Sequence, residues 1–473
     1  MKLRQINEYT WEIPKQGDMK VPAVIYSSSS LIEGVTKDRA LDQARNMACL
    51  SGIQKAAYVM PDAHQGYGFP IGGVAGFDMD QGIISPGGVG YDINCGVRLL
   101  RTDFNEKELS SHKKVLIDAI FNKIPTGVGK GRSRTLKGKE IKQICIQGAR
   151  WVVEKGYGVQ EDLERTEEQG CIKPADPGFL SSRAISRGSN QLGSLGSGNH
   201  FLELQKVTQI YDSKTAETFG INSKDQILVM IHCGSRGLGH QVASDYIKLM
   251  EKEIGTQGLP DRQLVNAPIQ SKLGEKYYKA MNSAVNFAFA NRQMIAHLIR
   301  EVFENVLGTS GNMKQVYDVC HNVAKFEDHK IKGKNTRMCI HRKGATRSFG
   351  PGHKEIPNIY RHEGQPVLIP GSMGTSSYVL VGTQKAEQLS FSSTAHGAGR
   401  VMSRRQALRS FRGEKIKKEL ESRGIELRAA GWKSVAEEAS QVYKDVDEVV
   451  RVSDSLGIGK SVVKADPIAV IKG

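Results

Sequence analysis

The clearest hydrophobic pattern in the chain is a helical repeat over residues 275–307. Its apolar residues recur mostly at steps of three and four, which places them on one face of a long helix. They are Met281, Ala284, Ala288, Ile295, Leu298, Val302 and Val306. Weaker helical periodicity covers residues 37–53, 107–122, 141–155 and 239–254, and a densely basic helical pattern covers residues 402–423. The sequence therefore predicts helices in both halves of the chain.

Short apolar runs bounded by glycine and polar residues predict β-strands in the same parts of the chain. They cover residues 56–60, 82–84, 97–101, 227–232, 365–369 and 377–381. Helices and strands do not alternate regularly, as they would in a Rossmann fold or an α/β barrel. No internal repeat or low-complexity linker divides the sequence. We therefore predict an α+β fold in one large domain, in which residues 126–139 and 170–178 form surface loops or insertions.

The net charge and the spacing of the cysteines limit the classes of protein to which this chain can belong. The chain has 66 Lys and Arg residues against 50 Asp and Glu residues, a formal net charge of +16. This excess favours a polyanionic partner such as nucleic acid, although a basic surface can also serve solubility alone. The seven cysteines are scattered and form no CxxC pair, which argues against disulfides and structural zinc. Because no apolar run is long enough to span a membrane and residues 1–15 are polar, we expect a cytoplasmic protein.

Several glycine-rich motifs carry side chains that can bind metal ions. PDAHQGYGFPIGGVAG (residues 61–76) contains Asp62 and His64, and SPGGVGYDINCGVR (85–98), GSLGSGNHFLE (193–203), MIHCGSRGLGH (230–240) and VCHNVAK (319–325) contain further candidates. Each candidate alone has an ordinary alternative role, as a turn cap, a buried thiol or a structural histidine. Together they offer oxygen, sulfur and nitrogen ligands that suit a pair of manganese or zinc ions, and their spacing does not choose between the metals. The candidate ligands are Asp92, Cys95, His200, His232 and His321.

The motif SSTAHGAGR (392–400) presents a histidine next to small residues. The imidazole of His396 would be accessible there, and backbone amides could approach a phosphate. A histidine that attacks a phosphoryl group must be neutral and needs cations nearby for the leaving group. Arg400 and Arg404 could bind such anions. From these residues alone, a loop histidine without any role is an equal alternative. PGSMGTSS (370–377) is a further candidate phosphate-binding loop. At the end of the chain, the sequence alone predicts that Lys472 belongs to a frayed terminus.

In the same order and over essentially the whole chain, these motifs resemble those of the RtcB family of 3′-phosphate/5′-hydroxyl RNA-splicing ligases. The matching segments are PDAHQGYGFPIGGVA, GGVGYDINCGVR, GSLGSGNHF, HCGSRGLGH, CHN, PGSMGTSSY, HGAGR, YKDVD and the terminal IKG. The resemblance implies one ligase domain over residues 1–473 with two manganese ions in a deep pocket. Cys95 would bridge the two ions, and Asp92, His200, His232 and His321 would complete their coordination.

The resemblance also implies the reaction. His396 would attack the α-phosphate of GTP and carry GMP, which would pass to an RNA 3′-phosphate and leave when the 5′-hydroxyl of a second strand attacks. A 2′,3′-cyclic phosphate end would first be hydrolysed. The substrates would be tRNA halves or broken RNA, in tRNA splicing or RNA repair. The family expectation is a working monomer, and the need for an activating protein is left open.

The resemblance further implies a set of nucleotide contacts, and the arginines of the motifs are candidates for RNA phosphates. The nucleotide contacts are Asn199, His200, Phe201, Leu202, Glu203, His321, Asn322, Pro370, Gly371, Ser372, Met373, Ser377, His396, Gly397, Ala398, Gly399, Tyr443 and Lys472, and the phosphate candidates are Arg236, Arg400 and Arg404. We hypothesise that Glu203 faces the hydrogen-bond donors of guanine and that Lys472 faces its O6 atom.

Two other functions use parts of the same pattern. A metal-dependent phosphohydrolase or cyclic phosphodiesterase would need the ligand set but not His396. A non-catalytic RNA-binding protein would need only the basic residues. The many ligand-type residues at glycine turns argue against this last function.

Overall fold

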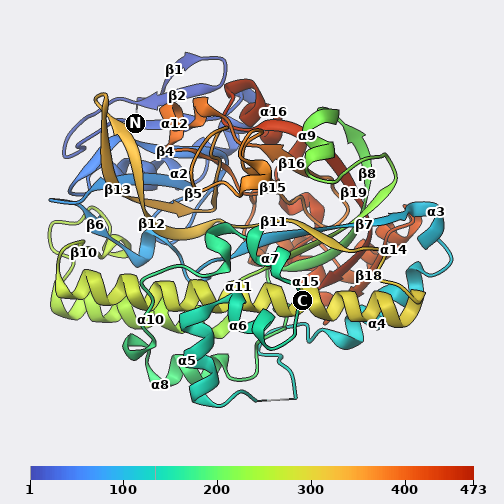
Figure 1. Cartoon of the computed structure of the whole chain (residues 1–473). Helices are drawn as coiled ribbons and strands as arrows, with labels where there is room; N and C mark the ends of the chain where they lie inside the picture. Colours follow the sequence, from blue (N-terminus) through green and yellow to red (C-terminus); the bar gives the residue numbers. More distant parts are fainter. Residues whose placement is uncertain (1, 134) are drawn as a thin grey trace.

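The computed structural model describes residues 2–133 and 135–473 and shows an α+β fold, as predicted (Figure 1). One sheet has seven strands in the order β1-β2-β3-β4-β5-β13-β12. Its neighbours are antiparallel except β3 and β4, which run parallel and are linked through α1 (Ser29–Thr36) and α2 (Ala40–Met47). The strands are β1 (Arg4–Asn7), β2 (Thr10–Ile13), β3 (Ala23–Tyr26), β4 (Ile53–His64), β5 (Ile71–Asp78), β12 (Asn322–Ile331) and β13 (Lys334–Lys343).

A second sheet has eight strands in the order β11-β7-β9-β8-β19-β16-β15, with β18 parallel to β19 beside this path. The other neighbouring strands are antiparallel. The strands are β7 (Gly96–Asn105), β8 (Phe201–Ile210), β9 (Gln226–Cys233), β11 (Lys314–Cys320), β15 (Pro366–Ile369), β16 (Ser377–Val381), β18 (Glu426–Ala429) and β19 (Lys460–Lys472). The last strand of the chain thus lies inside the sheet, so that Lys472 is buried and the prediction of a frayed terminus is wrong.

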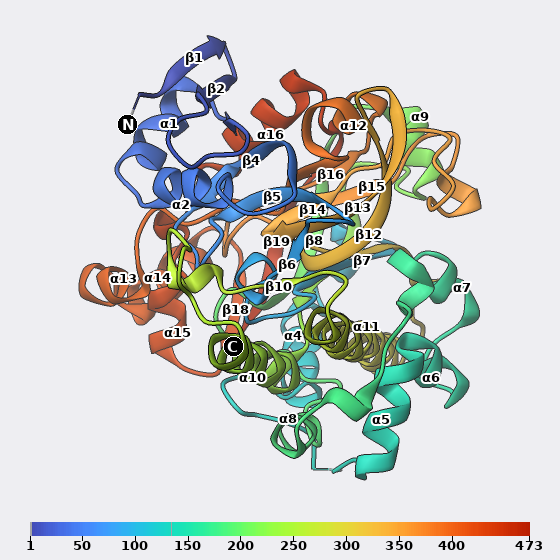
Figure 2. The same ribbon diagram turned by 90° about the vertical axis from the view of Figure 1, so that its left-hand side faces the viewer.

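The long helix predicted over residues 275–307 is confirmed as α11 (Lys272–Leu307). The side chain of Ser271 caps its first turn, and Gly308 ends it in the left-handed conformation with φ of 73°. It packs against α4 (Lys113–Lys123), α5 (Gly138–Gln147), α6 (Ala149–Glu154) and α10 (Arg236–Glu253). Figures 1 and 2 show α5, α8 (Ser182–Gly188), α10 and α11 together on one side of the sheets, so that α11 supports the strands from below.

Three predicted helices are interrupted, and the clearest reason lies at Gly148. This residue separates α5 from α6 with φ of 60°, and a side chain there would collide with the carbonyl oxygen of Gly170 at 2.0 Å. The predicted helix 107–122 divides into α3 (Glu106–Leu109) and α4, and the predicted helix 402–423 divides into α13 (Arg404–Ser410) and α14 (Gly413–Ser422). At Gly148, a tertiary contact that periodicity does not record therefore sets the boundary.

The remaining elements are short, and four of the strands among them form two small sheets, β6 with β10 and β14 with β17. Figure 2 shows α13, α14 and α15 (Trp432–Glu437) gathered beside β18. The others are β6 (Ile83–Ile84), α7 (Gln160–Glu164), α9 (Ser213–Thr218), β10 (Ala267–Pro268), β14 (Ala345–Arg347), α12 (Gln384–Ser390), β17 (Ser393–Ala395) and α16 (Val446–Leu456). Between Gly127 and Lys137 the described residues form neither helix nor strand, and position 134 of that predicted loop lies outside them. Within the described ranges, no helix combines the length and apolar character that crossing a membrane requires.

Candidate functional site

Four of the five predicted metal ligands lie at neighbouring ends of the second sheet. Cys95 immediately precedes β7, His200 precedes β8, His232 lies at the end of β9, and His321 follows β11. The strand register pairs Gly96 with both Cys233 and Cys320, and Phe201 with His232. Because adjacent strands lie less than about 5 Å apart, this register brings the four side chains together.

The ligand atoms form two groups that share one thiol. The Sγ atom of Cys95 lies 3.3 Å from Nε2 of His232, which lies 3.3 Å from Nε2 of His321. On the other side, the same Sγ atom lies 3.5 Å from Nε2 of His200, which lies 2.7 Å from Oδ2 of Asp92. Each group is compact enough to surround one cation. A shared thiolate with two such groups suits a pair of ions, so the donor set fits the predicted centre.

The protonation of the ligands favours coordination as well. Burial, together with neighbouring cationic groups, lowers the pKa of His232 and of His321 well below the usual value, so both imidazoles are neutral with a lone pair to donate. The Nδ1–H of His200 can donate to the carbonyl oxygen of Leu195 at 3.0 Å, which directs Nε2 toward Asp92 and Cys95. Burial opposes the charged imidazole, but Asp92 outweighs it and raises the pKa of His200, so a cation bound there would displace the Nε2 proton. Burial and the charge of Asp92 raise the pKa of the Cys95 thiol to about 12. A bound cation would offset that cost and favour the thiolate.

A buried arginine fixes the backbone next to these ligands. Arg292 of α11 donates hydrogen bonds to the carbonyl oxygens of Asn94 and Cys233 at 2.9 and 2.8 Å. Its guanidinium also pairs with Asp318 of β11, which pairs with Arg98 of β7, and all three side chains are fully buried. The buried charges are thus compensated by one another and by backbone acceptors. α11 therefore holds the residues beside Cys95 and His232 in place.

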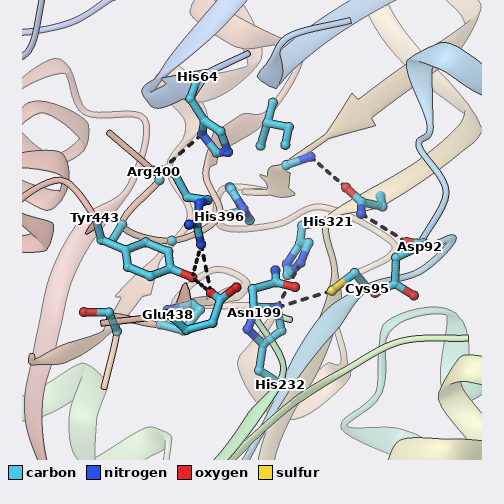
Figure 3. Close-up of a pocket in the computed structure, with 18 of the residues that line it drawn as sticks. His64, Asp92, Cys95, Asn199, His232, His321, His396, Arg400, Glu438 and Tyr443 are labelled. Atoms are coloured by element: carbon cyan, nitrogen blue, oxygen red, sulfur yellow. Dashed lines mark hydrogen bonds and ion pairs between the residues drawn. The ribbon is translucent and has the colours of Figure 1, made fainter. Parts of the chain in front are cut away.

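His396 lies next to the ligand cluster. Its ring is 4.8 Å from the ring of His321 between centroids, and Figure 3 shows Cys95 and Asp92 beyond His321. Oδ2 of Asp62, a buried residue of β4, accepts hydrogen bonds from Nδ1 of His396 at 2.5 Å and from its backbone N–H at 2.9 Å. Burial opposes the charge of Asp62, but the charge and hydrogen bonds of His396 outweigh it and lower the pKa of that carboxyl. An ionised Asp62 favours the tautomer with the proton on Nδ1, which leaves the lone pair on Nε2.

The loop after His396 passes very close to the Asp62 strand. Gly399 has φ of 72°, and a Cβ atom there would lie 2.0 Å from the carbonyl oxygen of Asp62. Lys444 ties the same region together, because its ammonium donates to the carbonyl oxygens of Pro61 and Ala63 at 3.0 and 2.6 Å. Only glycine fits at position 399, which explains the second glycine of the HGAGR motif.

A cavity of about 330 Å³ joins His396 to the ligand cluster. Most of the predicted site residues line it: Asp92, Cys95, Asn199, Phe201, His232, His321, Asn322, Pro370, Gly371, Ser372, Met373, His396, Gly397, Ala398, Gly399, Arg400, Arg404, Tyr443 and Lys472. The cavity therefore gathers residues from motifs spread over most of the sequence. It is large enough for part of a nucleotide beside the candidate metal centre.

A cluster of charged residues forms one wall of this cavity (Figure 3). The buried carboxylate of Glu438 accepts hydrogen bonds from Arg400 at 3.0 Å, from Arg404 at 3.1 Å and from the hydroxyl of Tyr443. The guanidinium of Arg400 also lies over the Tyr443 ring, 5.3 Å from its centroid. Glu438 thus fixes two cations and an aromatic ring at the edge of the cavity.

Five predicted residues do not line the central cavity. His200 and Arg236 face a neighbouring groove instead, and Leu202, Glu203 and Ser377 lie behind the wall. Glu203 is buried, and Gln205 links it to Ser377 through hydrogen bonds of 2.7 and 3.0 Å. Its Oε1 atom has no hydrogen-bond partner among the described residues, and burial raises the pKa of Glu203 to about 8. Lys472 does line the cavity, where burial lowers its pKa to about 8.

Several residues at the cavity or directly behind it were missed by sequence reasoning. Asp62 and His64 stand in the first quoted motif, but nothing local shows that Asp62 reaches His396, 334 positions away. Glu438 and Lys343 carry no motif signal. The ammonium of buried Lys343 donates to the carbonyl oxygens of Phe69 and Gly87 at 3.2 and 3.1 Å, and burial lowers its pKa to about 7. Their place at the cavity comes from the tertiary fold alone.

Known proteins match this chain over its whole length. A family model described as tRNA-splicing ligase RtcB matches residues 43–473. The tRNA-splicing ligase RtcB of Archaeoglobus fulgidus is 52% identical, covering 100% of this chain and 99% of the relative, and that of Thermococcus kodakarensis is 51% identical with the same coverage. An RNA-splicing ligase RtcB homolog of Entamoeba histolytica is 48% identical over 93% of this chain and 84% of its own length. The chain therefore belongs to the RtcB family.

Proposed function

We propose that this protein is an RNA ligase that joins 3′-phosphate or 2′,3′-cyclic phosphate ends to 5′-hydroxyl ends through a GMP–histidine intermediate. Membership of a family named for tRNA-splicing ligases supports the reaction class. The observation that carries the mechanism is the position of His396. Its Nδ1 atom is held by buried Asp62, and its ring lies next to a double cluster of metal-ligand side chains. A metal-dependent phosphohydrolase does not require GMP on a histidine, so covalent labelling separates the two functions.

The metal centre of the proposed enzyme would be held by residues that already face one another. Cys95, His232 and His321 would hold one manganese ion, and Asp92, Cys95 and His200 the other. When bound, the two ions would act as Lewis acids that offset the negative charge of the reacting phosphates. The protein itself would supply the alignment, which is the larger part of catalysing phosphoryl transfer.

In the first step, Nε2 of His396 attacks the α-phosphorus of GTP. The new P–N bond forms as the bond to the β-phosphate oxygen breaks, and pyrophosphate leaves. The imidazole keeps its proton on Nδ1, where Asp62 stabilises the positive charge that develops on the ring. Arg400 and Arg404 lie at the edge of the same cavity and can balance the charge of the leaving group.

In the next steps the GMP moves to RNA and then leaves. An oxygen of the RNA 3′-phosphate attacks the phosphorus on His396, the P–N bond breaks, and Nε2 regains its lone pair. The 5′-hydroxyl of the second strand then attacks the RNA phosphate, loses its proton and expels GMP. A 2′,3′-cyclic phosphate would first be opened by water in the same cavity. RNA that is cut during tRNA splicing or damaged would supply such ends.

A groove beside the metal centre offers a path for RNA. The groove encloses about 670 Å³. Asp92, Asn199 and Arg404 line both the groove and the central cavity, and Arg187 and Arg236 line the groove alone. Arginines with planar, forked guanidinium groups suit the phosphates of a nucleic-acid backbone. We therefore place RNA phosphates on Arg236 and Arg404. Arg400 is already held by Glu438, the Met402 carbonyl oxygen and the Glu437 carbonyl oxygen.

The decisive experiment is covalent labelling. The protein is incubated with manganese and GTP labelled at the α-phosphate, denatured, and digested to map the labelled peptide. Label on the peptide that contains His396 would establish the intermediate. Absence of any label on metal-loaded protein, with a known ligase labelled in parallel, would contradict the proposal.

The role of Asp62 gives a separate prediction. Replacing Asp62 with asparagine keeps the shape of the side chain but removes the charge that holds the Nδ1 proton and stabilises the cationic ring. We expect the rate of GMP attachment at saturating GTP to fall by about 10²- to 10⁴-fold, as for other carboxylates that orient a catalytic histidine. The half-saturating GTP concentration and the bound metal content should change little, because Asp62 contacts neither. A loss of metal in this variant would instead indicate a structural role.

The selection of guanine over adenine gives a further prediction. In the proposed complex Lys472, which lines the cavity, donates to O6 of guanine, and a shift of the wall in front of buried Glu203 lets its unpartnered Oε1 atom accept hydrogen bonds from the guanine N1–H and amino groups. Because glutamine can present an N–H to those donors, Glu203→Gln should reduce the preference for GTP over ATP by about 10-fold or more. Competition labelling with both nucleotides measures the ratio. An unchanged preference would remove Glu203 from the recognition of guanine.

A further inference from the structure

A second cavity opens on the other flank of the His396 loop. It encloses about 530 Å³ and shares His64 and Arg400 with the central cavity, where the Arg400 backbone N–H donates to Nδ1 of His64 (Figure 3). Its other walls come from the end of α1, from the turn after β4 and from the residues before α13. They are Gly34, Lys37, Asp38, Ala63, Gln65, Gly66, Val401, Met402, Ser403, Gln406 and Lys444. None of the proposed metal ligands lines this cavity.

The chemistry of this second cavity suits a short stretch of single-stranded nucleic acid. Lys37 is exposed, and its ammonium makes no hydrogen bond or ion pair with any residue that the structure describes. Lys444 adds a buried cation. Val401, with 54% of its surface exposed, offers an apolar face for a base. The one lining carboxylate, Asp38, already accepts backbone N–H groups from Arg39 and Gln65 at 2.6 and 2.7 Å. The ammonium of Lys444 is already hydrogen-bonded to the carbonyl oxygens of Pro61 and Ala63, so Lys37 is the cation that is free to meet a phosphate. A free cation beside an apolar surface suits a sugar–phosphate chain with a stacked base.

The product of sealing places a geometric demand on the protein. Two strands enter the reaction centre and one continuous strand passes through it, so the RNA needs two separate openings. The arginine-lined groove meets the central cavity on the side of Asp92 and Asn199. The second cavity meets it on the side of His64 and Arg400. The two openings share none of their lining residues, and they leave the central cavity at different edges.

We propose that the second cavity binds the RNA strand that ends in the 3′-phosphate. This inference rests on the proposed function. The 3′-phosphate must reach the GMP on His396, and the second cavity opens at the loop that carries this histidine. The strand with the 5′-hydroxyl is then left with the arginine-lined groove beside Asp92. Backbone phosphates upstream of the 3′ end lie near Lys37, and a base packs on Val401 and Met402.

The test measures each strand separately on protein that already carries GMP. An RNA with phosphates at both ends can accept GMP but cannot be sealed, so the RNA concentration that half-saturates its capping reports the 3′ arm. Rates are compared per mole of GMP–protein. The variant K37E/V401E, which adds negative charge at two exposed positions, should raise this concentration about fivefold to tenfold. K224E, an exposed reversal outside both openings, should leave it unchanged.

The 5′ arm is measured with RNA whose 3′ end is already joined to GMP. Arg236→Ala should raise the concentration of 5′-hydroxyl strand needed for sealing, and K37E/V401E should not. An unchanged capping concentration in K37E/V401E would overturn the assignment, as would a larger effect of this variant on the 5′-hydroxyl strand. Failure of the wild-type protein to take GMP at all would instead overturn the proposed function, so the two failures are distinguishable.

Discussion

Replacement of His396 by alanine is expected to abolish covalent labelling by GTP and the sealing of RNA that ends in a free 3′-phosphate, while the metal content stays unchanged. In the proposed reaction no other side chain takes the GMP, because His396 lines the cavity and the contact of its Nδ1 atom with Asp62 leaves Nε2 for the attack. Loss of a covalent nucleophile costs about 10⁴-fold or more in rate. Label retention after denaturation and end joining of a matched RNA pair measure the two activities on the same preparation.

The His396→Ala variant also distinguishes a nucleophile from a metal ligand. The ring of His396 lies 4.8 Å from that of His321, and His396 belongs to neither group of candidate ligands. His396→Ala should therefore still bind two metal ions per chain, and it should still join RNA that has been joined to GMP chemically at its 3′ end. His112→Ala, at an exposed histidine, is the matched control and should retain full labelling. If His396→Ala loses its metal, the histidine acts as a ligand rather than as the nucleophile.

The sequence predicted those parts of the fold that depend on local patterning. The α11 helix has an apolar stripe long enough to be recognised, and its caps at Ser271 and Gly308 are ordinary local signals. The split between α5 and α6 was not predicted, because the backbone at Gly148 responds to Gly170. The position of β19 was also missed. Its apolar run is visible in the sequence, but only pairing with β8 and β18 buries Lys472 beside the cavity.

The candidate site also combines residues that local motifs indicate with residues that only the tertiary fold brings together. Glycine turns at strand ends marked Cys95, His200 and His232 as ligand candidates, and the sheet register then brings them together. The contact between Asp62 and His396 joins residues 334 positions apart, and no spacing rule records it. Glu438 lies on no motif, although it holds Arg400 and Arg404 in place. Motifs therefore identified the side chains that would touch metal or nucleotide, whereas the residues that orient them required the structure.

Replacement of Cys95 by alanine is expected to remove metal binding and ligation together. The thiol is the only member shared by the two candidate ligand groups among the described residues, so its loss leaves each group with two ligands. Changes to outer hydrogen bonds of a metal site already cost about 10- to 100-fold in affinity, and loss of a bridging ligand should cost more. Elemental analysis of desalted protein should show fewer than one ion per chain, and GTP labelling should disappear with the metal.

The loss of metal can be assigned to the missing thiol only if the Cys95→Ala variant is folded. Cys95 is buried beside strands that Arg292 holds through the carbonyl oxygens of Asn94 and Cys233, and alanine leaves those hydrogen bonds in place. The thermal transition of the metal-free variant should therefore lie close to that of metal-free wild type. Cys145→Ala, at a fully buried thiol outside both ligand groups, should keep two ions and full labelling. If Cys95→Ala retains two ions, the thiol does not bridge them, and two independent ligand sets must be sought. If the variant retains one ion, Cys95 coordinates only one of the two ions. The retained ion is then bound by the group of side chains that does not need the thiol.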